Sequence, residues 1–148
     1  MKVAYIDASA GASGDMLLGA LLDSCIEISD LEGILLALDV SGVALEANKD
    51  VRRGVSGTYI AVVLSEEARQ PRRWQDFVDI VQHSSLSEKV KEKSTAVFKL
   101  IGDAEAKVHG TDPEHVNLHE LGTLDTLIDV VGVVAALEKA GIQKVYSS

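Results

Sequence analysis

The distribution of apolar and polar residues predicts strands and helices along the first half of the chain. Residues 3–6 form a short apolar run typical of a buried strand, and the glycine-rich turn that follows leads into a predicted helix over residues 14–24. A second helix is expected over residues 31–38. Residues 43–64 alternate apolar with polar or small side chains before a β-rich run, which predicts two antiparallel strands with their turn near Arg53.

The second half of the chain is predicted to be mainly helical. Residues 65–73 are polar and form a loop, after which the apolar spacing predicts a helix that begins at Trp74. The clearest helix covers residues 87–109 and ends at Gly110, because glycine readily takes the left-handed conformation of a helix end. We expect its buried face to consist of residues spaced by three, four and seven positions, namely Val90, Val97, Leu100, Ile101, Ala104 and Val108.

A last helix is predicted from about residue 121 or 123 to residue 140, and a strand over residues 142–146 follows it. The element order is therefore βααββαααβ, with about five helices and a small mixed sheet. This order lacks regular βαβ alternation, so it indicates an α+β or α/β fold in a single domain over residues 1–148. The sequence stops at Ser148, two residues after this strand, so we expect the native chain to extend further.

Charge and cysteine content narrow the classes of function. The chain of 148 residues has a net charge of −9, from 23 acidic and 14 basic residues. An acidic domain repels the phosphate backbone of nucleic acids, and it suits a metal cation or a basic partner better. Cys25 is the only cysteine, which excludes an intramolecular disulfide and a cysteine-based metal site. We find no secretory signal and no apolar run of roughly 18 residues that could span a membrane, so we expect a cytoplasmic protein. A second copy of the chain, in a homo-oligomer, is one option for its partner.

A first candidate site lies in the turn after the first strand. Asp7 stands at the end of this strand, and Asp15 lies in the first turn of the following helix. Gly11 and Gly14 let a ligand approach the backbone, and the free N–H groups of a helix start bind anions such as phosphate. Two acids beside a glycine-rich turn indicate a metal or metal–phosphate site. In the alternative, structural interpretation the glycines only permit a tight turn, while Ser13 and Asp15 start the helix.

A second candidate site precedes the last helix. His115, Asn117 and His119 alternate with apolar residues, so in an extended segment their side chains share one face. His119 is followed by Glu120, and imidazole together with carboxylate suits nickel, zinc or iron. The segment lacks the His-Glu-x-x-His spacing of metalloproteases, so the His–Glu pair alone does not specify a metal.

Two further acids lie on one stripe of the last helix. Asp125 and Asp129 are four residues apart, and the stripe is otherwise apolar. Like charges at this spacing disfavour a helix by a few tenths of a kcal/mol, which a bound cation would offset. Alternatively, Asp125 is only a first-turn acid that the helix dipole favours.

The remaining histidines and the arginines are less specific. His109 lies in the last turn of the long helix, where it interacts favourably with the helix dipole, and His83 is expected at the surface. Five arginines either gather to hold an anionic small molecule or an acidic partner, or remain solvated. They are Arg52, Arg53, Arg69, Arg72 and Arg73.

Four ordered segments together match the motifs of one known family. The first contains Asp7, Gly11, Ser13, Gly14, Asp15 and Met16. The second contains Val51, Arg53, Val55, Gly57 and Thr58, and the third contains Glu105, Ala106, Val108, His109 and Gly110. The fourth contains His119, Glu120, Gly122, Asp125, Asp129 and Gly132. On these motifs, the chain resembles the LarC-type nickel-insertion proteins, also described as pyridinium bis-thiocarboxylate mononucleotide nickel chelatases.

The chain departs from the family pattern at three places. Residues 70–73 read Gln-Pro-Arg-Arg where a histidine-rich stretch is usual, Asn117 replaces a histidine, and Ala10 replaces a serine. The first two changes reduce the number of nitrogen donors for nickel. The family protein is also much longer, and its region that binds CTP with a divalent metal lies outside this chain.

The resemblance implies that the chain is part of a protein that inserts nickel into a pyridinium bis-thiocarboxylate mononucleotide, driven by CTP hydrolysis, to form the nickel-pincer cofactor of lactate racemase. In that scheme, the residues near the cofactor phosphate or its metal are Asp7, Gly11, Ser13, Gly14 and Asp15. Those that hold or deliver nickel are His119, Glu120 and Asp125, with His109 as outer support. The chain alone is not expected to complete the reaction, so the remainder of its own protein is an expected partner. The competing interpretation is a non-catalytic assembly module whose metal ligands are degenerate.

Overall fold

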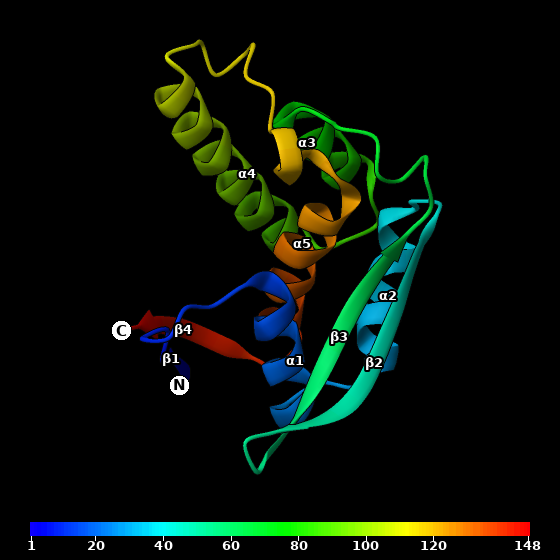
Figure 1. Ribbon diagram of the computed structural model, residues 1–148, viewed down its shortest axis with the longest axis vertical. Helices are drawn as coiled ribbons and strands as arrows, with labels where there is room; N and C mark the ends of the chain where they lie inside the picture. The colour runs from blue at the N-terminus through cyan, green and yellow to red at the C-terminus, as the bar shows by residue number, and fades with distance from the viewer.

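A computed structural model describes residues 1–148 as an α+β fold, which confirms the predicted class and element order (Figure 1). The elements are β1 (Lys2–Ile6), α1 (Gly14–Ser24), α2 (Ile28–Leu38), β2 (Val43–Arg52), β3 (Val55–Leu64), α3 (Trp74–His83), α4 (Glu88–His109), a short 3-10 helix η1 (His119–Gly122), α5 (Leu124–Lys139) and β4 (Ile142–Ser147). Local signals account for most of these limits. Helix α4, for example, begins after Ser87, whose hydroxyl accepts the Val90 N–H, and ends at Gly110 with a φ of 62°.

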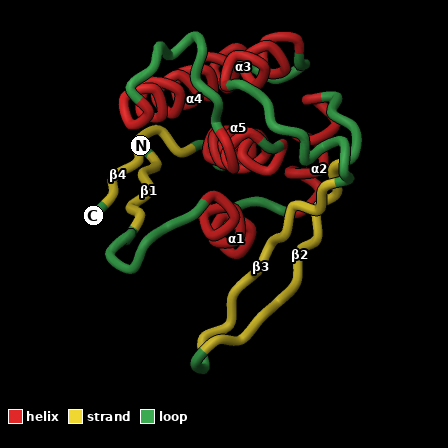
Figure 2. Tube along the Cα trace, turned by 45° about the horizontal axis from the view of Figure 1, so that its top comes forward, coloured by secondary structure: helices red, strands yellow, loops and turns green.

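The four strands form two separate two-stranded sheets. Strands β1 and β4 are parallel, with Tyr5 opposite Tyr146, whereas β2 and β3 form a long antiparallel hairpin from Val43–Leu64 to Arg52–Val55. We predicted one small mixed sheet. The structure has both kinds of strand pairing, but in two separate sheets. Figures 1 and 2 both show α1 between the β1–β4 pair and the hairpin.

Helix α5 is the centre of the structure, and helices α1, α2 and α4 all pack against it. Two hydrophobic clusters meet on its surface, one that includes Leu127 and Val131 and one that includes Ala136. Leu18 of α1 lies in the second cluster and packs beside Gly132 of α5. The helix therefore fixes the position of α1, whose N-terminal end carries the first candidate site.

The carboxylate of Asp23 attaches the far end of α1 to the hairpin. It accepts hydrogen bonds from the Thr58 N–H at 2.7 Å and the Thr58 hydroxyl at 2.6 Å, and it pairs with Lys49. These interactions, led by the hydrogen bond from Lys49, lower the pKa of Asp23 to about 2. Helix α1 is thus held against both the hairpin and α5.

The buried face predicted for α4 is confirmed at Val90, which is 2% exposed, and wrong at Leu100 and Val108. Its fully buried positions recur every four residues and are Val90, Ser94, Phe98, Gly102 and Ala106. Leu100 and Val108, which we expected inside, are 69% and 78% exposed. The reason is a close helix contact: a Cβ on Gly102 would overlap the Trp74 ring of α3, so small residues face the core. None of the helices combines the length and apolar character that a bilayer crossing requires.

The prediction that residues 3–6 form a buried strand is correct for the strand and wrong for its burial. Val3 is 43% exposed and Tyr5 68% exposed, while Tyr146 in the paired strand is 52% exposed. Parallel strands are normally covered on both faces, and apolar runs such as this one are their signature. In this chain, no further strand flanks the β1–β4 pair.

Candidate functional site

The turn after β1 lies against the start of α5, and the contact depends on a glycine. A Cβ on Gly14 would overlap the Cβ, Cγ and Oδ2 atoms of Asp129, which leaves no room for a side chain at this position. Ser13 occupies the N-cap position of α1, but its hydroxyl donates to Asp15 Oδ1 and does not cap the helix backbone. The close approach brings Asp15 of α1 next to the acidic stripe of α5.

Asp15, Asp125 and Asp129 form a cluster of carboxylates, which we call the acidic cluster. Burial, together with the smaller effects of the charges of Asp125 and Asp15, raises the pKa of Asp129 to about 7. The pKa of Asp125 is raised by burial first and by Asp15 second, but its side chain is exposed, so the main electrostatic penalty falls on Asp129. The Oδ1 atom of Asp129 is buried and accepts no hydrogen bond, so no protein donor stabilises the ionised form of this carboxylate at that oxygen.

The apolar surroundings of Asp129 explain its desolvation. It lines a pocket of about 330 Å³ whose other walls are mainly aliphatic, from α1, α4, η1 and α5. Besides Asp129, the pocket is lined by Gly14, Leu17, Val97, Leu121, Thr126, Val130, Val133 and Val134. A charge in such a place is unfavourable unless a cation or a proton accompanies it.

His119 of the second candidate site lies next to His109, at the end of α4. The rings of His109 and His119 are 4.8 Å apart between centroids, and His109 Nε2 lies 3.4 Å from a Glu105 carboxylate oxygen. His119 has a φ of 49°, a left-handed conformation that turns the chain into η1. His115 and His119 are exposed. The intervening Val116 and Leu118 are 2% and 1% exposed, which confirms the predicted alternation around Asn117.

Other predicted site residues lie apart from these groups. Asp7 is exposed at the end of β1, where hydrogen bonds from Ser9 lower its pKa, and its charge does not contribute to the shift at Asp129. Glu120 is exposed on η1, and Gly11 has a φ of 90° with no atom near its missing Cβ. Across the chain, no three His, Cys, Asp or Glu side chains converge to hold one metal ion.

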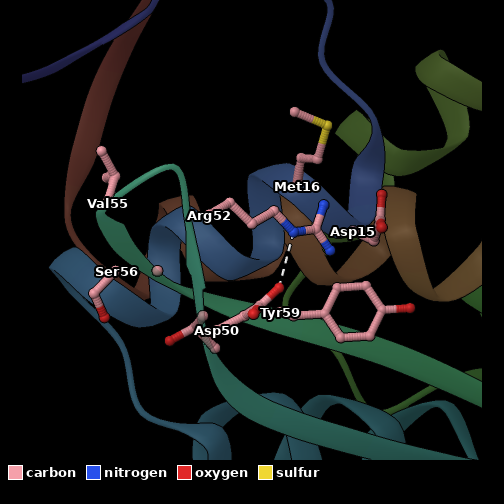
Figure 3. A pocket seen from close by; sticks show the side chains of 9 residues that line it. Asp15, Met16, Asp50, Arg52, Val55, Ser56 and Tyr59 are labelled. Carbon is pink, nitrogen blue, oxygen red and sulfur yellow. Dashed lines mark hydrogen bonds and ion pairs between the residues drawn. The ribbon is translucent and has the colours of Figure 1, made fainter.

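A groove between α1 and the hairpin contains residues that the sequence analysis did not bring together (Figure 3). Its volume is about 250 Å³, and Asp15 and Met16 line one side of it. On the other side, Arg52 Nε donates to Asp50 Oδ2 at 2.8 Å, and the Arg52 guanidinium carbon lies 6.0 Å from the centroid of the Tyr59 ring. Asp15 is thus part of both the groove and the acidic cluster.

The i, i+2 spacing of Asp50 and Arg52 is the sequence signal that indicates the groove, because it places both side chains on one face of a strand. Tyr59 joins them only through the register of the hairpin, in which it faces Asn48. The sequence of either strand alone does not indicate this register.

The five arginines do not gather. Arg52 and Arg53 lie at the tip of the hairpin, and ten paired residues on each strand, roughly 33 Å at 3.3 Å per residue, separate the tip from the base where the loop at residues 65–73 begins. Arg72 donates to the carbonyl oxygens of Ala68 and Gln70, and Arg73 pairs with Asp76 in the first turn of α3. Among the five, Arg52 alone lines the groove.

Comparison with known proteins places these features in a family. The family model described as "Nickel insertion protein" matches residues 4–148. A protein of Thermomicrobium roseum named for nickel insertion is 44% identical over 147 residues, which is 98% of this chain and 36% of that protein. The pyridinium-3,5-bisthiocarboxylic acid mononucleotide nickel insertion protein of Desulfitobacterium hafniense is 42% identical over 148 residues, which is 100% of this chain and 37% of that protein. The chain therefore spans a little over a third of the length of these curated relatives. No solved structure matches it.

Proposed function

The chain belongs to the nickel insertion protein family, and on this basis we propose that it receives nickel at the acidic cluster, next to a groove that binds a pyridinium mononucleotide. The name of the Desulfitobacterium relative supplies both the metal and the nucleotide class. The finer expectations belong to the same proposal: the product is the nickel-pincer cofactor of lactate racemase, and CTP with a divalent metal acts through a region outside this chain.

The observation that carries the proposal is the buried Oδ1 atom of Asp129, which has no hydrogen-bond partner. A buried carboxylate oxygen without a hydrogen bond, next to Asp125 and Asp15, favours the binding of a divalent cation that neutralises the group. Oxygen and imidazole nitrogen donors are both suitable for nickel, and the His109–His119 pair supplies the second kind. Glu120 is exposed beside His119 and belongs to the same proposed donor set.

The lack of three convergent donors fits a protein that transfers its metal. Nickel in this proposal is cargo, so the protein provides only part of its coordination and leaves the other positions to the sulfur donors of the nucleotide. A complete set of protein ligands would hold the metal in place and oppose its release. Asp15 is the residue that connects the two parts, because it borders the groove and contributes to the electrostatics of Asp129.

The groove offers the groups that a pyridinium mononucleotide needs. A cationic ring is attracted to the face of Tyr59, and the Arg52 guanidinium can pair with a phosphate. The turn at Gly11, Ser13 and Gly14 leads into the first turn of α1, whose free N–H groups favour an anion. In this proposal, the exposed carboxylate of Asp7 serves the metal that accompanies the phosphate.

Calorimetric titration of the 148-residue chain with nickel tests the metal site. We expect micromolar or tighter binding at neutral pH, weakened by at least about tenfold in Asp129→Asn, a loss of about 1.4 kcal/mol. The matched control is Asp103→Asn, which removes one carboxylate from the exposed surface of α4 and should leave affinity unchanged. Unaltered binding by His119→Ala would remove His119 from the donor set. Equal affinities of Asp129→Asn and the unmodified chain would contradict the acidic cluster as the site.

A non-catalytic assembly module is the second candidate function. The exposed apolar residues of β1, β4 and α4 favour it. The same titration separates the two functions, because a module that only packs against a partner binds neither nickel nor zinc nor manganese.

A further inference from the structure

The β1–β4 pair exposes apolar side chains on both of its faces. Tyr5 and Tyr146 lie opposite each other and are 68% and 52% exposed. Val145, whose side chain points to the other face, is 46% exposed. Two parallel strands alone are not a stable unit, and parallel sheets are found with both faces covered. Strand β4 pairs only with β1, so the backbone groups along its other edge are available to a further strand.

Helix α4 exposes a second apolar stripe, separate from this sheet. Leu100 and Val108 are 69% and 78% exposed, although their spacing is that of a buried helix face. Val97 continues the stripe and, with Leu121 of η1, borders the aliphatic pocket that contains Asp129. Helix α4 and the β1–β4 pair both contact α5, and Figure 1 shows α4 extending away from the β1–β4 pair, so the two apolar areas flank α5 without touching each other.

We propose that, in the longer members of this family, polypeptide outside the matched region packs on both apolar areas, the β1–β4 pair and the exposed stripe of α4, and adds a parallel strand to the free edge of β4. The curated relatives are long enough to provide this cover, because the matched region is only 36% or 37% of their length. An exposed surface of this kind in a soluble protein marks an interaction site. The added layer also closes the pocket around Asp129, so the acidic cluster is completed by a second part of the protein. This inference does not depend on nickel binding.

Cysteine labelling tests the surface directly. We would insert this chain in place of the matching region of the Desulfitobacterium relative and replace Cys25 and every other cysteine by serine. Tyr146→Cys and Leu100→Cys should then react with a maleimide at least about tenfold more slowly in the chimera than in the 148-residue chain, because labelling requires local opening of a covered surface. Leu36→Cys, at a position of α2 that is 81% exposed and outside this surface, should react at the same rate in both.

Equal labelling rates for Tyr146→Cys in the two proteins would overturn the proposal. So would slow labelling in the 148-residue chain that becomes fast on dilution, because a second copy would then be the occupant. If labelling of all three cysteines were slowed equally in the chimera, the protection would not be specific to this surface, and the proposal would be contradicted. For a chimera that does not fold, the same substitutions at the matching positions of the intact relative and of its matching segment provide the comparison.

Discussion

Asp129 packs so closely against Gly14 that a Cβ at residue 14 would overlap three atoms of the aspartate side chain. This contact joins two segments that are 115 residues apart in the sequence, the turn after β1 and the start of α5. It also excludes water from one side of a carboxylate that already faces an aliphatic pocket. The glycine therefore has a structural and an electrostatic consequence, since it allows the approach that raises the pKa of Asp129 to about 7.

Gly14→Ala should lower the free energy of unfolding by about 1–3 kcal/mol, because the new methyl group displaces Asp129 and moves α1 away from α5. Urea unfolding followed by circular dichroism measures this change. Gly33→Ala is the matched control: it lies inside α2 with no atom within 4 Å of its Cβ position, so it should stabilise the chain by about 0.5–1 kcal/mol. Stabilisation by both substitutions would show that the contact at Gly14 is not tight.

The stability of the chain should decrease as pH rises from about 4 to about 7, and Asp129→Asn should remove most of that decrease. The unfolded chain loses the Asp129 proton near its ordinary pKa of about 4, whereas the folded chain keeps it until the pKa of about 7. Across this window the folded state binds more protons, so the free energy of unfolding falls with pH. After allowance for solvent screening, we expect a decrease of no more than about 3 kcal/mol.

Urea unfolding at about pH 5 and about pH 8 measures the difference. At the higher pH, Asp129→Asn should be more stable than the unmodified chain, since it contains no charge to desolvate. Asp103→Asn removes the same charge from an exposed position and should leave the difference between the two pH values as it is. The opposite order, with Asp129→Asn less stable at about pH 8, would mean that a protein cation compensates the carboxylate.

Local sequence signals predicted the elements well and the burial less well. The limits of α1 follow from the glycine-rich turn, and the end of α4 follows from Gly110, because each depends on backbone preferences within a few residues. The buried face of α4 did not follow, because close packing against Trp74 requires a glycine at residue 102 where a hydrophobic pattern expects a large residue. Tertiary contact overrode the periodicity.

The candidate site was predictable in its parts and not in its assembly. Asp15, Asp125 and Asp129 each stood out from their neighbours, and the spacing of the last two indicated one stripe of α5. The proximity of Asp15 to Asp125 and Asp129 depends on how α1 packs against α5, which no short segment of the sequence indicates. The groove at Arg52 and Tyr59 depends on the hairpin register in the same way.

Tyr59→Leu should weaken the binding of nicotinic acid mononucleotide, a pyridinium mononucleotide without sulfur, by about three- to thirtyfold, because the leucine keeps the apolar contact and removes the aromatic face. Arg52→Gln should weaken it by about tenfold through loss of the charge-assisted hydrogen bonds to phosphate. Calorimetric titration measures both. The controls are Tyr5→Leu, on the β1–β4 pair, and Arg53→Gln, which removes the neighbouring charge outside the groove. Equal losses in Arg53→Gln and Arg52→Gln would reduce the effect to net charge.

Ser94→Ala should raise the free energy of unfolding, whereas Ser84→Ala should lower it, although both serines are buried and the same atoms are removed. The Ser94 hydroxyl is completely buried in α4 and has no hydrogen-bond partner, so its loss relieves an unfavourable desolvation of about 1–2 kcal/mol. The Ser84 hydroxyl donates to the Val81 carbonyl oxygen at 2.6 Å, and its loss should lower stability by about 1 kcal/mol. Urea unfolding at a single pH compares the two. A decrease for Ser94→Ala would show that its hydroxyl forms a hydrogen bond within the core.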